Sequence, residues 1–240
     1  VRTAQYNLNR QRSRIRIFET GQCFYEVSGE ISTYKAMAGL VCGQRAPLDW
    51  TANKDMSDFY DIKGDIESVI TLTGLFEEFD FAPISHGALH PGQAASILFR
   101  GSEVGCIGQL HPKLQSGFNL VTPTFLFHMD LQCILGCRLP AHKDFSKYPE
   151  IRRDLALIVK SEIKAGDVVS CARQSGVANL IHVAVFDVFD GLEDAQNMKS
   201  LGITLTFQNP DRTLSDNEID QAIERVVTIL GMRYGAKLRS

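Results

Sequence analysis

The stretch SLGITLTFQNPDRTLSDNEIDQAIERVVTIL (residues 200–230) joins a strand pattern to a helix pattern. Large apolar residues occupy every second position of its first part: Leu201, Ile203, Leu205 and Phe207. This period is that of a strand with one buried face. In the second part, Ser215 and Glu218 form a capping box, and apolar residues then recur at helical spacing to about Tyr234.

The neighbouring residues supply the other elements of the same domain. LALIVK (155–160) and NLIHVAVFDVFD (179–190) predict strands, AGDVVSCARQSG (165–176) predicts a helix, and AKLRS (236–240) predicts a short last strand. The order strand-helix-strand-strand-helix-strand is that of a ferredoxin-like fold. Such a fold covers one face of its sheet with two helices and leaves the other face open.

The first half of the chain predicts a mostly antiparallel sheet with helices, an α+β module. Strand patterns occur at RIRIFETGQCFYEV (14–27), KAMAGLVCG (35–43) and TFLFHMD (124–130), and AASILFRGSEVGCIGQLHP (94–112) predicts a hairpin. DFYDIKGDIESVITLTGL (58–75) predicts a helix.

The segment LGCRLPAHKDFSKYPE (135–150) has two prolines and mixed charge, which indicates a linker. We therefore expect two domains, 1–142 and 143–240. The chain starts without methionine and runs toward a strand pattern, so we expect it to be part of a longer protein.

Composition excludes several classes of protein. The net charge of −3 gives no overall basic footprint for nucleic acid, although a local patch is compatible with it. No apolar run approaches the ~20 residues that span a bilayer, so we expect no membrane association. Six scattered cysteines without CxxC spacing predict reduced thiols and a cytoplasmic location.

The sequence contains no complete active site. The patterns G-x-S-x-G, G-x-G-x-x-G and G-x-x-x-x-G-K-[ST] are absent. Cys133 and Cys137 could share a helix face, and His86 and His90 have a helical metal-ligand spacing, but glycine and proline beside these histidines disfavour a helix. With His111 also in a loop pattern, we expect no catalytic residue and no metal.

Arg10, Arg12, Arg14 and Arg16 alternate, so a strand would place all four on one face. Such a row needs acidic neighbours, a phosphate or a partner subunit, or else forms a solvated edge strand.

Arg152 and Arg153 precede a buried strand and could contact phosphate at the end of a sheet. The alternative is an ion pair within the chain, with Glu150 or Asp154.

The open face of the second domain is a candidate surface for RNA. Ser200 has the parity opposite to Leu201, and Asp187 marks the outward parity of the preceding strand, which places Phe189 outward as well. An aromatic ring beside a carboxylate and a hydroxyl can stack on an unpaired base and hydrogen-bond to it. The alternatives for Phe189 are an ordinary exposed aromatic residue or packing against another domain.

Several stretches resemble the bacterial phenylalanyl-tRNA synthetase β-subunit family. In the second half they are KYPEIRRDLALIV (147–159), VFDVFDG (185–191) and MKSLGITLTFQNPDRTLSDNEI (198–219), which resemble the anticodon-binding domain of that family. In the first half they are NLNRQRSRIRIFETGQCF (7–24), AGLVCGQR (38–45), DFYDIKGDIESVI (58–70), LHPGQAASILF (89–99) and IGQLHPKL (107–114), which resemble its catalytically silent class II synthetase-like module.

The resemblance implies a role in attaching phenylalanine to tRNA within an α2β2 assembly. The partners would be tRNA(Phe), the catalytic α subunit and a second β subunit, with ATP and Mg²⁺ used at the α subunit and no cofactor in this chain. The guanine-reading positions of the family fall on Asp187, Phe189 and Ser200; the family usually has tyrosine where this chain has Phe189. We expect Arg152 and Arg153 to contact anticodon-stem phosphates. The alternative function is a ferredoxin-like regulatory domain that binds a small molecule or a protein.

Overall fold

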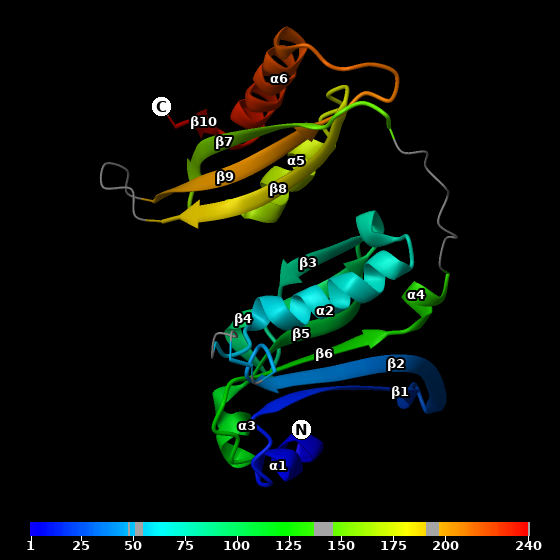
Figure 1. Ribbon diagram of the computed structural model, residues 1–240. Helices are drawn as coiled ribbons and strands as arrows, with labels where there is room; N and C mark the ends of the chain where they lie inside the picture. The colour runs from blue at the N-terminus through cyan, green and yellow to red at the C-terminus, as the bar shows by residue number, and fades with distance from the viewer. Residues whose placement is uncertain (48, 51–54, 137–145, 191–196, 240) are drawn as a thin grey trace. The chain divides into compact units, whose positions relative to one another are not determined.

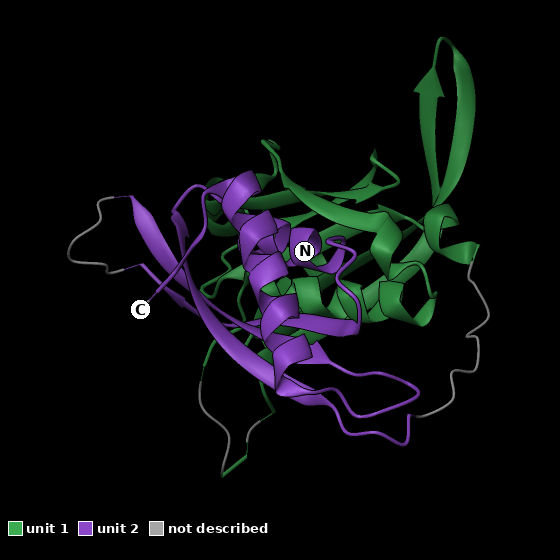
Figure 2. Ribbon diagram, turned by 90° about the horizontal axis from the view of Figure 1, so that it is seen from above, with its two compact units in different colours: residues 1–141 green, residues 142–240 purple. Residues whose placement is uncertain are grey.

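The computed structural model describes residues 1–47, 49–50, 55–136, 146–190 and 197–239. The chain divides into two compact units, residues 1–141 and 142–240, which are coloured separately in Figure 2. Both units combine an antiparallel sheet with helices, which confirms the predicted α+β class.

Unit 1 contains a six-stranded antiparallel sheet in the order β1-β2-β6-β5-β4-β3 (Figure 1). Its strands are β1 (Arg14–Val27), β2 (Glu30–Gly43), β3 (Phe79–Pro83), β4 (Leu89–Phe99), β5 (Ser102–Leu110) and β6 (Thr124–Asp130). The turn between β4 and β5 has positive φ at both Arg100 (52°) and Gly101 (79°), the geometry that favours a two-residue hairpin.

One face of this sheet packs against helix α2 (Phe59–Leu72). The helix begins at Asp58, whose side chain accepts hydrogen bonds from the backbone N–H groups of Tyr60 and Asp61 at 2.8 and 3.0 Å. Its apolar stripe is buried against residues of β2, β4, β5 and β6: Ile62, Ile66 and Ile70 from the helix with Val41, Ile97, Ile107, Phe127 and Met129 from the sheet. Shorter helices are η1 (Phe76–Glu78), α3 (Pro112–Gly117) and α4 (Gln132–Leu135).

The N-terminal residues differ from the prediction. Residues Arg2–Leu8 form helix α1, whose Ala4 and Leu8 pack with Ile15, Leu40 and Cys42. Since β1 begins only at Arg14, Arg10 and Arg12 are not in a strand, and the prediction of four aligned arginines was wrong. Arg10 instead lies over the ring of Tyr6 at 3.4 Å from its centroid.

Unit 2 has the predicted strand-helix-strand-strand-helix-strand order. Its elements are β7 (Ile151–Lys160), α5 (Ala165–Arg173), β8 (Leu180–Phe189), β9 (Met198–Phe207), α6 (Asp216–Tyr234) and β10 (Lys237–Leu238). The four strands are arranged in the order β10-β7-β9-β8, so β9 lies at the centre and β8 at an edge (Figure 1).

Both helices of unit 2 pack on one face of its sheet. Leu201, Ile203, Leu205 and Phe207 of β9 are buried together with Val168 and Ala172 of α5 and Ile219, Val226 and Leu230 of α6. The alternation in β9 therefore predicted the covered face correctly.

The start of α6 is fixed by the predicted capping box. The Glu218 carboxylate accepts hydrogen bonds from the backbone N–H of Ser215 at 3.0 Å and from its hydroxyl at 2.8 Å. Arg212 also binds Glu218, and its guanidinium is the largest reason why the pKa of Glu218 lies far below the ordinary value. At the other end, Gly235 stops the helix with φ of 65°.

Candidate nucleic-acid interface

The face of the unit 2 sheet opposite α5 and α6 is defined by strand register. On β9 the residues between the buried apolar positions are Ser200, Gly202, Thr204 and Thr206, and β7 and β8 pair with β9 on both sides. We call this surface the open face, because the core that contains both helices lies on the other side. Thr204 is tied to β7 by a 2.6 Å hydrogen bond from its hydroxyl to Asp154.

Asp187, Phe189 and Ser200 lie together on the open face. Asp187 pairs with Gly202, and Phe189 pairs with Ser200. Phe189 is 47% exposed and Asp187 is also exposed, whereas Ser200 is only 5% exposed. Ser200 is enclosed because β9 is the central strand, with β7 and β8 on either side of it.

A β-bulge places one further aromatic residue on this face. The register shifts between Val185 and Asp187, so Phe186 has no partner of its own on β9. Its ring lies over Gly202 on the open face and is 61% exposed. Counted back from Asp187, regular alternation assigns Phe186 to the covered face, and the strand pattern alone therefore does not place both residues on the open face. The one available signal was the glycine in an otherwise large-residue strand.

Arg152 and Arg153 lie on opposite faces of the sheet. Arg152 pairs with Thr206 on the open face, and its guanidinium is 3.5 Å from the carboxylate of Glu150. Arg153 is on the helix side, where it donates a 2.9 Å hydrogen bond to Asp216 at the start of α6. The structure therefore brings only Arg152 to the same face as Asp187 and Phe189.

The segment before β7 is anchored to the end of β9. The Ser146 hydroxyl donates to the carbonyl of Asn209 at 3.1 Å, and the Gln208 side chain donates to the carbonyl of Tyr148 at 2.8 Å. These two bonds hold the charged lead-in beside the open face and fix the backbone that carries Arg152.

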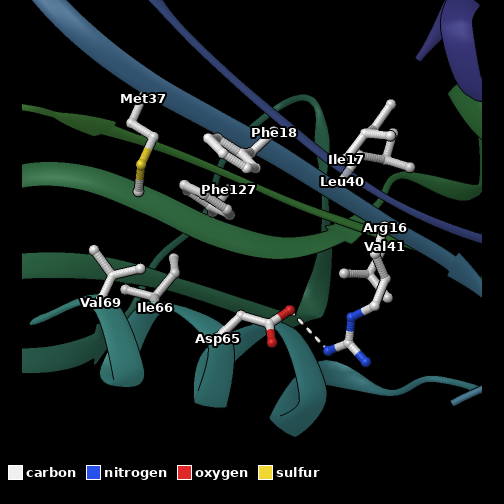
Figure 3. A pocket seen from close by; sticks show the side chains of 10 residues that line it. All are labelled: Arg16, Ile17, Phe18, Met37, Leu40, Val41, Asp65, Ile66, Val69 and Phe127. Atoms are coloured by element: carbon white, nitrogen blue, oxygen red, sulfur yellow. Dashed lines mark hydrogen bonds and ion pairs between the residues drawn. The ribbon is translucent and has the colours of Figure 1, made fainter. Parts of the chain in front are cut away.

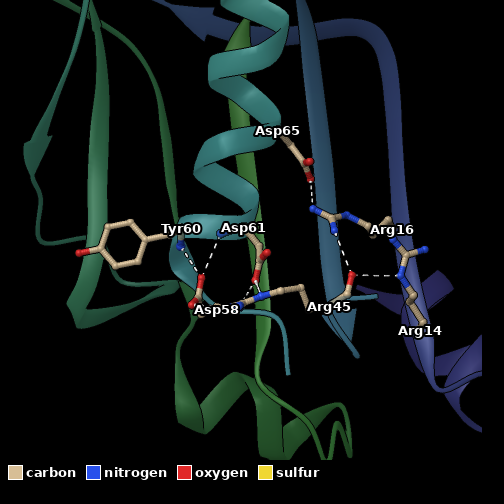
Figure 4. Close-up of polar contacts among 7 residues, drawn as sticks. All are labelled: Arg14, Arg16, Arg45, Asp58, Tyr60, Asp61 and Asp65. Carbon is tan, nitrogen blue, oxygen red and sulfur yellow. Dashed lines mark hydrogen bonds and ion pairs between the residues drawn. The ribbon is translucent and has the colours of Figure 1, made fainter. Parts of the chain in front are cut away.

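Two arginines of unit 1, Arg16 and Arg45, are tied to acidic residues of α2 and of its N-cap (Figure 4). Arg16 donates to Asp65 at 2.7 Å, and Arg45 binds Asp58 and Asp61 at 2.7 and 3.0 Å. Burial raises the pKa of Asp61, but the backbone N–H of Asp58 and the Arg45 guanidinium outweigh it and hold that pKa below its usual value. Acidic neighbours in the same unit thus compensate Arg16 and Arg45.

A pocket of about 310 Å³ lies between β1, β2 and α2 (Figure 3). Its walls are mostly apolar, and Arg16 and Asp65, already paired with each other, are its charged members. The lining residues are Arg16, Ile17, Phe18, Met37, Leu40, Val41, Asp65, Ile66, Val69 and Phe127. Asp65 is the one carboxylate of this lining, and Arg16 holds it in an ion pair.

The histidines and cysteines considered as metal ligands have local roles. His86, His90 and His111 each accept, through Nδ1, the backbone N–H two residues later, at 3.1–3.2 Å. Burial raises the pKa of Cys133 to about 11, whereas Cys137 lies outside the described residues. Among the residues that the structure describes, no three His, Cys, Asp or Glu side chains are grouped as a metal site.

Within the described parts of the chain, no helix combines the length and the apolar character needed to cross a bilayer.

Both units match families of known proteins. Residues 1–131 match the family described as "Phenylalanyl tRNA synthetase beta chain CLM domain", and residues 146–239 match the "Ferredoxin-fold anticodon binding domain". The second match does not favour the regulatory alternative for unit 2.

Relatives among curated proteins agree with these matches. The chain is 41% identical over 240 residues to the phenylalanine–tRNA ligase β subunit of Hahella chejuensis, 39% over 239 residues to that of Pseudomonas fluorescens, and 38% over 241 residues to that of Coxiella burnetii. Each alignment covers 100% of this chain and 30% of the relative, so the chain spans under a third of their length. The chain belongs to the phenylalanyl-tRNA synthetase β-chain family.

Proposed function

We propose that unit 2 binds the anticodon of tRNA(Phe) on its open face, with Asp187, Phe189 and Ser200 around one guanine. The observation that carries this proposal is an exposed aromatic ring beside an exposed carboxylate on a sheet face that α5 and α6 leave free. The match of residues 146–239 to an anticodon-binding family supports it.

Each of these side chains has a distinct task. The Phe189 ring stacks on the base, an interaction that every base can make. The Asp187 carboxylate accepts hydrogen bonds from the N1–H and N2–H groups of guanine, which adenine does not present in this arrangement. Ser200 lies opposite Phe189 on the neighbouring strand and has a hydroxyl that can both donate and accept.

Arg152 supplies phosphate contact beside this base site. Its partner Glu150 is 3.5 Å away, and both side chains are largely exposed. An exposed ion pair of this kind contributes only about 0–1 kcal/mol, so a phosphate can replace the carboxylate. Arg153 donates a hydrogen bond to Asp216 and so stabilises the start of α6. It can contact a phosphate only when this hydrogen bond to Asp216 breaks.

Crosslinking tests this assignment directly. The full-length β chain is assembled with its α subunit and bound to tRNA(Phe) that carries a photoreactive base at the anticodon guanine. We expect crosslinked peptides from 180–190 and 198–207, and competition by unlabelled tRNA(Phe). Crosslinks only to other parts of the enzyme would contradict the proposal.

We propose that unit 1 docks on the catalytic α subunit of an α2β2 phenylalanine–tRNA ligase, in the cytoplasm. ATP and Mg²⁺ then act at the α subunit, and the described residues of this chain offer no metal-ligand group.

A projecting arm formed by residues 22–35 supports the docking role. Figure 2 shows it as a two-stranded extension of unit 1 that lies beyond the last pairing of β2 with β6.

The arm exposes apolar side chains at its end. Ile31 is 77% exposed, and Phe24, Tyr25 and Val27 are also exposed. A two-stranded hairpin is only marginally stable alone in water, and clustered exposed apolar residues mark interaction sites. Contact with another subunit would cover this surface.

Charged substitutions in the arm should weaken assembly. Replacing Ile31 by Asp together with Phe24 by Asp is expected to raise the αβ dissociation constant at least about tenfold, because two buried contacts become desolvated charges. The measurement is analytical ultracentrifugation of α with full-length β. The matched control is Val121→Asp, an exposed apolar residue outside the arm. Equal assembly of the arm variant and wild type would exclude the arm as the docking surface.

A further inference from the structure

We infer that Phe186 is a second base-stacking residue of the open face, and that Gly202 is a glycine because the Phe186 ring lies on it. This inference rests on the proposed function, since it assigns the neighbouring unpaired base of the same RNA to the same site.

The first step is the position of the ring. A Cβ atom built on Gly202 would lie 2.8 Å from both Cε2 and Cζ of Phe186, closer than real Cβ atoms approach other groups. Gly202 has the parity opposite to the buried Leu201 and Ile203, so this Cβ would point to the open face. The far edge of the Phe186 ring therefore occupies the space above Gly202 on that face.

The second step is the bulge that leaves two consecutive residues of β8 on the open face. Val185 pairs with Ile203 and Asp187 pairs with Gly202, which leaves Phe186 as the additional residue of the edge strand. A bulge places two consecutive residues against one partner and can redirect a side chain. Here it puts Phe186 and Asp187 side by side over Gly202, whose built Cβ also comes within 3.1 Å of the Asp187 Cβ.

The third step is the energetic cost of this arrangement. Phe186 is 61% exposed, so the ring gains little from burial in the core. A glycine in the central strand and a bulge in the edge strand both weaken the sheet. The sheet loses stability at this place, and the aromatic ring remains exposed to water. This combination indicates a binding surface rather than a packing requirement.

The spacing between Phe186 and Phe189 indicates which ligand they bind. Gly202 and Ser200 are two residues apart on β9, about 6.6 Å at a strand rise of about 3.3 Å per residue. Phe186 lies at Gly202 and Phe189 lies at Ser200, so the two rings are near successive positions on one face of β9. Asp187 lies between the two phenylalanines in the sequence. Neighbouring unstacked bases of an extended single strand can span this distance, whereas stacked bases of a duplex lie closer together. The occupant is an unpaired nucleobase next to the one held at Phe189.

Mutations of both partners test the inference. In the α2β2 enzyme with full-length β, Phe186→Ala is expected to weaken tRNA(Phe) binding about 5- to 100-fold, and Phe186→Trp to preserve it. Gly202→Ala should also weaken tRNA binding, because the added methyl group displaces the Phe186 ring. In the Phe186→Ala background, Gly202→Ala should have almost no further effect. The matched control is Met232→Ala, an exposed apolar residue of α6.

Fluorescence separates this inference from the proposed function. 2-Aminopurine, which is quenched when stacked, is placed in turn at each unpaired position of the anticodon loop. We expect Phe186→Ala to restore fluorescence at the position next to the one restored by Phe189→Ala. If Phe189→Ala restores one position and Phe186→Ala restores none and leaves affinity unchanged, the inference is wrong while the proposed function stands. If neither variant changes quenching or affinity, both are wrong.

Discussion

Asp187→Ala is expected to lower kcat/KM for the charging of tRNA(Phe) by about 10- to 100-fold, and mainly through KM. Hydrogen bonds to a charged group contribute about 1.5–3 kcal/mol, and two N–H donors of guanine lose their acceptor together. The proposed function places the chemistry at the α subunit, so a loss of tRNA binding affects KM more than the rate of transfer.

Charge alone predicts that Asp187→Ala strengthens tRNA binding. Removal of a negative charge near RNA strengthens phosphate attraction, so a lower affinity of Asp187→Ala must come from lost hydrogen bonds. Asp220→Ala on α6, an exposed aspartate outside the open face, is the matched control and should leave charging unchanged or slightly improved.

The specificity of the loss identifies the contact. We expect wild-type enzyme to prefer tRNA(Phe) over a variant in which the anticodon guanine is replaced by adenine, and Asp187→Ala to lose most of this preference. Phe189→Ala should weaken both tRNAs by a similar factor, because stacking does not discriminate between bases. Phe189→Tyr keeps the aromatic ring and adds a hydroxyl, so it should bind at least as well as wild type. If Asp187→Ala and Phe189→Ala charge both tRNAs like wild type, Asp187 and Phe189 do not form the reading site.

Ile203→Ala is expected to destabilise unit 2 by about 2–5 kcal/mol, the range for a fully buried isoleucine that leaves a cavity. Ile203 is 0% exposed and lies at the centre of the core that joins β9 to both helices. A domain of this size has only about 5–15 kcal/mol of stability, so a large part of it would be lost.

Hydrogen exchange in full-length β measures this effect locally. Amides of β7, β8 and β9 should open more often, while the amides of unit 1 keep their protection, because the described residues that form this core all belong to unit 2. The control is Ile181→Ala on β8, where the same side chain is 51% exposed and the expected cost is about 1 kcal/mol or less. Equal effects of the two substitutions would contradict the placement of Ile203 at the centre of the unit 2 core.

Periodicity predicted most of the architecture. In β9, four large apolar residues at alternate positions determine which face is buried, since burial of the opposite face would expose Leu201, Ile203, Leu205 and Phe207 together. The capping box at Ser215 determined where α6 begins, because the unpaired N–H groups of a first turn need local acceptors. Both signals come from neighbouring residues and depend little on the rest of the chain.

The α1 helix and the arginines illustrate what local patterns miss. Alternation of Arg10 to Arg16 matched a strand, yet the residues before Arg14 adopt a helix and a turn, because Ala4 and Leu8 find apolar partners on β1 and β2. Arg16 pairs with Asp65 of α2, 49 residues away in the sequence, and Arg45 pairs with Asp58 at the start of that helix, 13 residues away. Such partners depend on which elements meet in the fold, and a short window of sequence does not contain that information.

Strand and helix periodicity predicted the α+β class and the covered face of the second sheet, and it named Asp187, Phe189 and Ser200 as candidates. The opposite faces of Arg152 and Arg153, the low exposure of Ser200 and the place of Phe186 on the open face follow from strand register and packing. Strand parity holds only while pairing is regular. One additional residue in an edge strand changes the parity of the residues after it, and the register against the partner strand is needed to locate that residue.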